Sequence, residues 1–163
     1  KDVAPTETAV VTQVKEALTH SVKVEGCEPT LSLGTAHTAL PRPDGSRLAP
    51  WPFRAAADNA LCASAEMEVE VAMLRLGCVS LLALPVEPSF ATAQQLEAMT
   101  GATRVLALAN GYVGYLEPAD VVRNRLGEAK RQWFGPELFD WLSPASALVA
   151  KTSLPEGPHV AGQ

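Results

Sequence analysis

Hydrophobic and polar residues alternate most regularly between residues 66 and 76. The apolar positions of this segment point one way and the acidic positions the other: Met67, Val69, Val71 and Met73 against Glu66, Glu68 and Glu70. Strict alternation predicts a half-exposed β-strand. Gly77 then turns the chain, and the continuous apolar run of residues 78–84 predicts a second strand that is covered on both faces.

A helix and a third strand should follow this run. Ser89 can cap a helix that runs to about Met99, and Gly101 closes it at a position that tolerates a left-handed turn. The residues expected to point inward are Phe90, Ala93, Leu96 and Met99. Residues 103–109 then predict another buried strand. Strand, helix and strand over 78–109 form a βαβ unit, so we predict an α/β fold with a mixed sheet and flanking helices.

The N-terminal third is less regular. Val10, Val11, Val14 and Leu18 predict an amphipathic helix over residues 8–19, and residues 22–33 look extended around a Gly26-Cys27 turn. Residues 41–52 are rich in proline and predict a long loop. Such a loop either binds a partner or is an ordinary surface connection.

The C-terminal third predicts two helices. Pro118 suits the first turn of a helix that reaches about Trp133, and Gly135-Pro136 breaks the chain before a short helix at residues 138–142. We expect one α/β domain over residues 1–154 and a flexible tail over 155–163.

Composition and charge restrict the function. The chain has 163 residues and a net charge of −5, with no cluster of Lys or Arg longer than two, which argues against nucleic-acid binding. The longest apolar run, residues 78–86, is too short to cross a membrane. Cys27, Cys62 and Cys78 form no CxxC pair and are interpreted as small buried residues, which leaves the compartment open. The first residue is Lys1 rather than Met, which agrees with proteolytic processing or with a shortened chain.

Candidate chemistry gathers after two predicted strands. Glu87 follows the first, and Tyr112 and Tyr115 follow the second, so neighbouring strands would bring them to one edge. Glu87 is a candidate metal ligand or general base, or simply an acid that stabilises a helix N-terminus. The tyrosines can coordinate a metal or stabilise an oxyanion, or they can simply cover the end of the sheet. Of the three histidines only His37 is of interest, since none pairs with another at ligand spacing.

Three motifs in this order resemble the neutral/alkaline non-lysosomal ceramidase family. Leu84-Pro85-Val86-Glu87 is similar to its Pro-Gly-Glu turn, with Val86 in place of the glycine. Asn110-Gly111-Tyr112-Val113-Gly114-Tyr115 is similar to its Asn-x-Tyr-x-x-Tyr segment. Residues 127–129, then Phe134-Gly135-Pro136 and Leu138, match the stretch that follows. The resemblance covers residues 66–142, the C-terminal part of that family's catalytic domain.

The resemblance implies a zinc amidase that cleaves the N-acyl bond of ceramide. The family's zinc is held by two histidines, a glutamate and a tyrosine. The glutamate falls on Glu87, and the tyrosine falls on Tyr115 or, second, on Tyr112. Zinc is therefore the implied cofactor, and Tyr112 and Tyr115 are the implied catalytic residues.

The family's histidine motifs are not found in this chain. An N-terminal partner chain that supplies the histidines would give a two-chain hydrolase of an acyl-amide or lipid-like molecule. Such a hydrolase is expected to be soluble, and secreted or processed. The alternative is a non-catalytic ceramidase-like interaction module. A large exposed apolar patch on the sheet would indicate such a partner.

Overall fold

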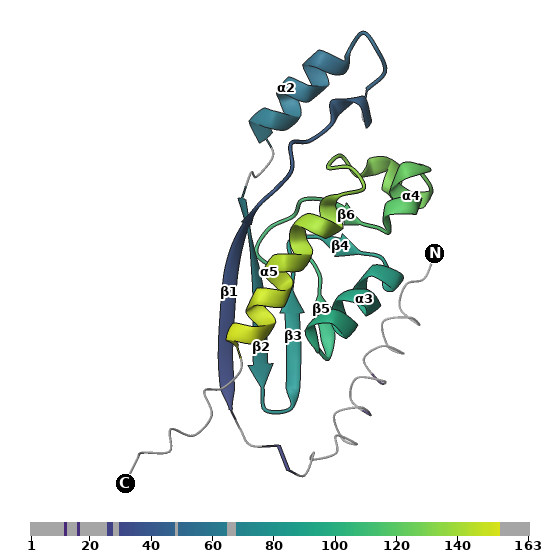
Figure 1. Cartoon of the computed structure of the whole chain (residues 1–163). Coiled ribbons are helices and arrows are strands. Elements are labelled where there is room, and N and C mark those ends of the chain that lie inside the picture. Colours follow the sequence, from purple (N-terminus) through teal and green to yellow (C-terminus); the bar gives the residue numbers. More distant parts are fainter. Residues whose placement is uncertain are drawn as a thin grey trace.

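A computed structural model describes residues 12, 16, 26–27, 30–47, 49–64 and 68–153. Its main sheet has four strands in the order β1-β2-β3-β5 (Figure 1). The strands are β1 (Leu31–Ala39), β2 (Glu68–Leu76), β3 (Val79–Ala83) and β5 (Arg104–Leu106). The first three pair antiparallel, while β5 pairs parallel to β3. A second, two-stranded parallel sheet joins β4 (Glu87–Pro88) to β6 (Tyr115–Leu116). The α/β class with a mixed sheet is confirmed.

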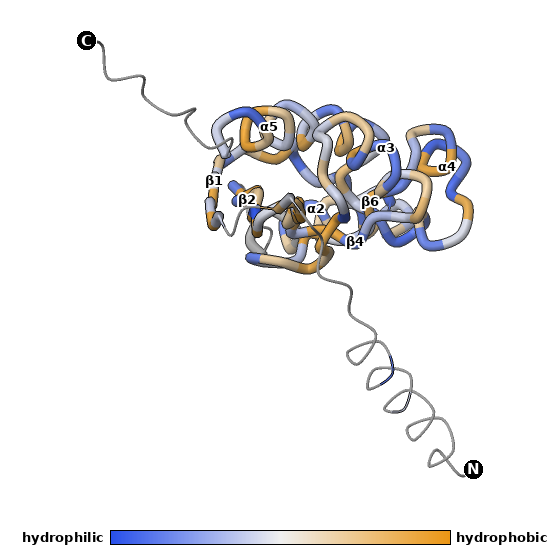
Figure 2. Tube along the Cα trace, turned by 90° about the horizontal axis from the view of Figure 1, so that it is seen from below, coloured by the Kyte–Doolittle hydropathy of each residue, from blue (hydrophilic) through white to orange (hydrophobic). Residues whose placement is uncertain are grey.

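Helices cover one face of the main sheet. The covering helices are α3 (Phe90–Thr100) and α5 (Leu138–Thr152). Helix α2 (Arg54–Ser64) contacts the 3-10 turn η1 (Gly45–Arg47) beyond the end of the sheet, and α4 (Ala119–Arg123) contacts the 3-10 turn η2 (Gly127–Arg131). Figure 2 shows α5 and α3 on the same side of the sheet. Under them lies the core, which includes Val71, Met73 and Leu82, each with 0% exposure.

The opposite face of the sheet is apolar toward one end, carries His37, Glu68 and Glu70 toward the other, and is left largely uncovered by the described residues. Register places alternate residues of each strand on this open face, defined here by Leu31, Leu33, Leu74, Leu76, Val79, Leu81 and Leu106. Leu31 is 73% exposed and Leu33 is 64% exposed. The strand at residues 78–84 was expected to be covered on both faces, but Val79 is 43% exposed because no helix of the described part covers this side.

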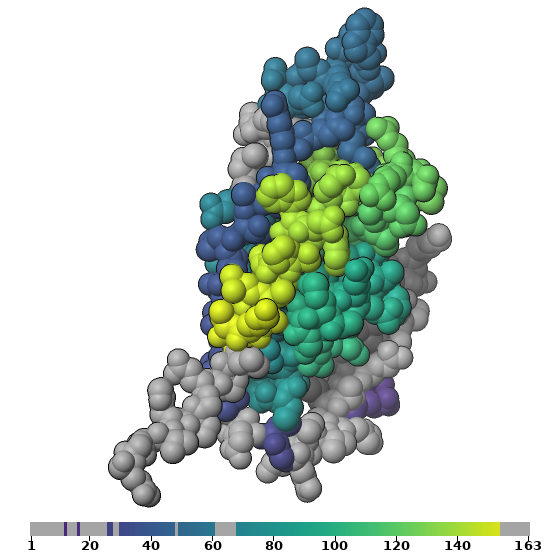
Figure 3. Space-filling view, in the orientation of Figure 1, coloured from purple at the N-terminus to yellow at the C-terminus, as the bar shows by residue number. Residues whose placement is uncertain are grey.

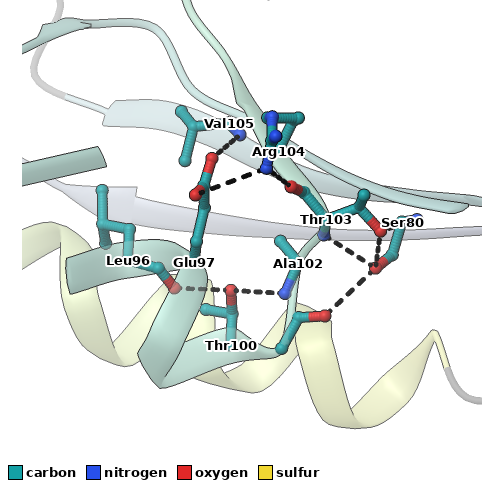
Figure 4. Close-up of polar contacts among 9 residues, drawn as sticks. Ser80, Leu96, Glu97, Thr100, Ala102, Thr103, Arg104 and Val105 are labelled. Carbon is teal, nitrogen blue, oxygen red and sulfur yellow. Dashed lines mark hydrogen bonds and ion pairs between the residues drawn. The ribbon is translucent and has the colours of Figure 1, made fainter. Parts of the chain in front are cut away.

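The predicted βαβ unit is present as β3-α3-β5. Gly101 ends α3 with a φ of 69°, and the side chains of Ser80 and Thr103 then fasten the crossover to β3 (Figure 4). The Glu97 carboxylate accepts a hydrogen bond of 3.2 Å from the Val105 amide. Glu97 therefore connects α3 to the edge strand β5.

Two expectations within this unit are wrong. Leu96 is buried as expected, but Phe90 is 79% exposed and Met99 is 43% exposed, and Thr92 and Thr100 are buried in their place. The helix is thus rotated relative to its simplest apolar stripe. The expected buried strand 103–109 shortens to an exposed edge strand, because the chain leaves the sheet after Leu106.

The helix expected from Pro118 to Trp133 is broken in two. Arg125 and Gly127 both have a φ of 51°, which ends α4 and starts η2. Arg47 fills the break, since its guanidinium donates to the carbonyls of Val122 and Gln132 at 3.0 and 2.6 Å. A distant arginine thus satisfies carbonyls that a continuous helix would have bonded internally.

The last helix is longer than expected. The short helix at residues 138–142 continues as α5 to Thr152, through Pro144. A proline inside a helix removes one backbone hydrogen bond. Here the burial of Leu142, Ser146 and Val149 against the sheet outweighs that loss.

Two of the cysteines form a disulfide, so their interpretation as small buried thiols is wrong. Cys27 is bonded to Cys78 in the turn between β2 and β3. The two lie 51 residues apart in sequence, which is why spacing did not reveal the pair. The third, Cys62, lies in α2.

Parts of the predicted organisation fall outside the described residues. Of the helix expected at 8–19, only Thr12 and Glu16 are described, and both are helical. The expected tail at 155–163 also lies outside, and the single domain over 1–154 stays a prediction. The Pro-rich loop includes η1 and leads into α2, an element that the sequence analysis did not predict.

Candidate functional site

Glu87 and Tyr115 lie side by side at the end of the main sheet. They are register partners in the parallel β4–β6 pair. The Glu87 amide donates to the Gly114 carbonyl at 3.0 Å, and the Ser89 amide donates to the Leu116 carbonyl at 3.0 Å. The two motifs that sequence reasoning singled out are therefore joined directly by backbone hydrogen bonds.

Local backbone geometry makes this pairing possible. Leu108 and Asn110 have φ values of 57° and 61°, and Gly114 has a φ of 104°. Such left-handed residues let the chain bulge away from β5 and return beside β4. Below the pair, Val86 and Leu116 have 0% exposure, so the strand ends rest on the core.

Tyr112 completes a cluster with these two residues, named here the Glu87–Tyr cluster (Glu87, Tyr112 and Tyr115). Partial burial raises the pKa of the Tyr112 phenol, with further contributions from Tyr115 and Glu87 and from a hydrogen bond with Tyr115. The Arg131 charge opposes this rise in pKa. A phenol is protonated at neutral pH even at its ordinary pKa, so Tyr112 is a hydrogen-bond donor there.

The cluster offers two oxygen donors of the kind that zinc accepts. A carboxylate and a phenol stand next to each other, but zinc usually takes four ligands. Within the part of the chain that the structure describes, no three His, Cys, Asp or Glu residues are grouped to hold a metal ion. The described residues thus fit half of a zinc site, and they do not complete one.

His37 takes part in a different cluster. Its Nδ1 lies 3.5 Å from Glu68 Oε1, and its Nε2 lies 3.6 Å from Glu70 Oε2. Glu70 also accepts a hydrogen bond of 2.6 Å from the Asn110 side chain. Because each ring nitrogen of His37 faces a separate carboxylate, this imidazole is not aimed at the Glu87–Tyr cluster. Sequence reasoning missed this group because cross-strand register alone brings His37 opposite Glu70.

A shallow hollow of about 290 Å³ lies along α3, apart from the Glu87–Tyr cluster. Its lining is Phe90, Ala93, Gln94, Glu97 and Arg104. Glu97 and Arg104 face each other there, with 4.0 Å between their charged groups (Figure 4). The Glu97 carboxylate already accepts a hydrogen bond from the Val105 amide, so little of its hydrogen-bonding capacity is left for a ligand in this hollow.

Comparison with family models and with curated proteins gives no match. Among solved structures, the chain is similar to a ceramidase complexed with C2, at a TM-score of 0.42 and 17% identity. It is also similar to a neutral ceramidase from Pseudomonas aeruginosa, at a TM-score of 0.40 and 17% identity. Each similarity covers 60% of this chain but only 17% and 18% of those proteins. The likeness concerns part of a much longer chain and assigns no residue a role.

Proposed function

We propose that this chain is the C-terminal portion of a ceramidase-like zinc hydrolase that cleaves an N-acyl amide bond in a lipid-like molecule. In this proposal another polypeptide supplies the histidine ligands, so that the active unit is a heterodimer or larger assembly. The observation that carries the proposal is the register pairing of Glu87 with Tyr115. Sequence motifs selected both residues, and they lie about thirty positions apart in the chain.

The chemistry of the cluster suits amide hydrolysis. The Glu87 carboxylate and the Tyr115 phenol oxygen would hold the zinc ion. When bound, zinc polarises the amide carbonyl and lowers the pKa of a bound water molecule. The Tyr112 phenol, which is protonated at neutral pH, would donate a hydrogen bond to the oxyanion that forms on the substrate carbonyl.

The open face supports the part of the proposal that concerns a partner. Apolar side chains on one face of a sheet are normally buried against a second layer. Leu31, Leu33 and Leu106 are exposed by 73%, 64% and 50%. A second polypeptide that covers this face would bury them, and it would lie close to the loop that carries Tyr112, because Leu106 leads directly into that loop.

The disulfide supports a location outside the cytosol. A bond such as Cys27–Cys78 persists mainly in oxidising compartments. We therefore propose a secreted or otherwise processed protein. In the part of the chain that the structure describes, no helix is long and apolar enough to cross a membrane.

Metal analysis tests the proposal most directly. Zinc would be measured by mass spectrometry in the chain alone and in the complex co-purified from its natural source. We expect stoichiometric zinc in the complex, and hydrolysis of a fluorogenic N-acyl amide by the same sample. Finding no zinc in either sample would overturn the proposal.

Substitutions then assign the roles within the complex. Glu87→Gln should remove zinc and reduce hydrolysis by about 100-fold or more, since even residues that support a ligand are worth 10- to 100-fold. Tyr112→Phe should keep zinc and lower kcat by about 100-fold, the usual loss for one oxyanion donor. Glu117→Gln is the matched control: it removes the same charge just beyond β6, and both readouts should stay at the wild-type level.

A non-catalytic interaction module is the second candidate. The described residues favour it, because no three His, Cys, Asp or Glu side chains among them are grouped to hold a metal ion. Under this alternative the complex forms through the open face but contains no zinc. The metal analysis therefore separates the two candidates.

A further inference from the structure

Two aromatic side chains are exposed next to each other at the end of the arm formed by η1 and α2. Trp51 is 87% exposed and Phe53 is 65% exposed. They alternate with Pro50 and Pro52, and we name residues 50–53 the aromatic tip. The arm projects beyond the sheet, and the aromatic tip lies at its far end (Figures 1 and 3).

The aromatic tip is held in a defined shape. The Phe53 amide donates to the Pro50 carbonyl at 2.9 Å, which closes the turn just before α2 begins. Asp58 in α2 accepts a hydrogen bond from the Gly45 amide in η1. Arg47 in η1 in turn donates to the Gln132 and Val122 carbonyls of the main body. The two rings are therefore presented by a supported arm.

Nothing charged lies within the aromatic tip itself. Its sequence is Pro-Trp-Pro-Phe, and the adjoining Arg54 lies 3.4 Å from Asp44 and 3.9 Å from Asp58. Phe90 offers a contrast, because it is 79% exposed but lines a hollow together with Glu97 and Arg104. Residues 50–53 carry no charged side chain. The aromatic tip can therefore move into an apolar medium without the cost of dehydrating a charge.

We infer that the aromatic tip inserts into the interfacial layer of a zwitterionic phospholipid surface. Tryptophan is enriched at membrane–water interfaces, where its ring lies at headgroup level and its N–H stays hydrated. A stable protein interface buries about 800 Å² on each partner, which a convex tip of four residues cannot supply. Shallow insertion of two rings needs no such area, so the observations favour a lipid surface. This inference is independent of the zinc proposal.

Vesicle binding of the full chain tests the inference. Phosphatidylcholine vesicles would be sedimented with wild type, with Trp51→Ala/Phe53→Ala, and with the control Phe90→Ala, which removes an equally exposed ring elsewhere. We expect the double variant to lower the partition coefficient by at least about 10-fold, since two large apolar groups are lost. The control should bind like wild type. Circular dichroism should show that all three proteins are folded alike.

A second measurement locates the inserted side chain. Brominated phosphatidylcholine should quench tryptophan fluorescence in the wild type, and Trp51→Phe should lose most of this quenching although Trp133 and Trp141 remain. Equal binding by wild type and the double variant would overturn the inference, as would binding that requires anionic lipid. Failure of wild type to bind phosphatidylcholine vesicles would likewise overturn it.

Discussion

On the side of α5 and α3, the main sheet buries Val71, Met73 and Leu82 completely, whereas on the opposite side Leu31 and Leu33 remain 73% and 64% exposed. Both sets of residues are apolar, and both follow the same alternation along their strands. The alternation therefore tells which residues share a face, but it does not tell which face receives a helical layer. The covered face stabilises the fold, whereas the described residues leave the apolar end of the other face open.

Polar contacts also hold the C-terminal end of α5 on the covered face of the sheet. Arg75 donates to the Ala150 carbonyl and to the Ser153 hydroxyl, both at 3.0 Å. Ser32 donates to the Ser153 carbonyl at 2.8 Å. Carbonyls at the end of a helix lack partners within the helix, so these side chains fix α5 on the sheet.

The largest expected effect comes from truncating a side chain on the covered face. Leu82→Ala should lower the free energy of unfolding by about 2–5 kcal/mol, because it leaves a cavity under α5 and α3. Leu33→Ala on the open face, which removes the same atoms, should cost about 0.5 kcal/mol or less. Urea denaturation measures both. Equal losses of unfolding free energy in the two variants would contradict the conclusion that only one face is covered.

A smaller loss is expected at Gly34, where the end of α5 lies close to β1. A Cβ on Gly34 would lie 3.1 Å from Ser153 Cβ and 3.2 Å from Thr152 Oγ1. Gly34→Ala should therefore destabilise the protein by about 1–3 kcal/mol, although alanine is otherwise preferred over glycine in a strand. Thr35→Ala, one residue along on the exposed side, should change stability by about 0.5 kcal/mol or less. A gain in thermal stability for Gly34→Ala would contradict the close contact.

The smallest effect is expected for a charge on the open face. Leu33→Lys should leave the unfolding free energy within about 0.5 kcal/mol of wild type, since the long stem can follow the sheet and the ammonium group can reach water. In sedimentation experiments the same variant should weaken association with the proposed partner. A loss of stability of about 2 kcal/mol or more would mean that the chain itself buries Leu33.

Much of the βαβ unit could be predicted from residues 66–109. Val69 and Val71 face inward as their alternation requires, and Gly101 adopts the left-handed conformation expected after a helix. Helix ends were harder to predict. Helix α5 passes through Pro144 because its apolar face is buried. The helix after Pro118 breaks at Arg125 and Gly127, where Arg47 bonds the carbonyls that the break leaves free. Both outcomes depend on residues far away in the chain.

For the candidate site, sequence selected Glu87, Tyr112 and Tyr115, and the structure shows that they are neighbours. Their roles in metal binding and catalysis stay predictions. The His37–Glu70 contact could not be foreseen, because it follows from the register of two strands joined by a long connection. The Cys27–Cys78 bond escaped for the same reason.

The sequence by itself determined the elements whose signal is local: the alternating strand, the helix that Gly101 ends, the turn glycines and the two motifs that bear Glu87 and Tyr115. Only the tertiary structure decided which sheet face is covered, where the last two helices begin and end, and which cysteines pair. The physical reason is that local patterns act through the backbone of a few residues. The covering of one sheet face, the hydrogen bonds from Arg47 to the broken helix and the disulfide pairing instead depend on side chains brought together from distant parts of the chain.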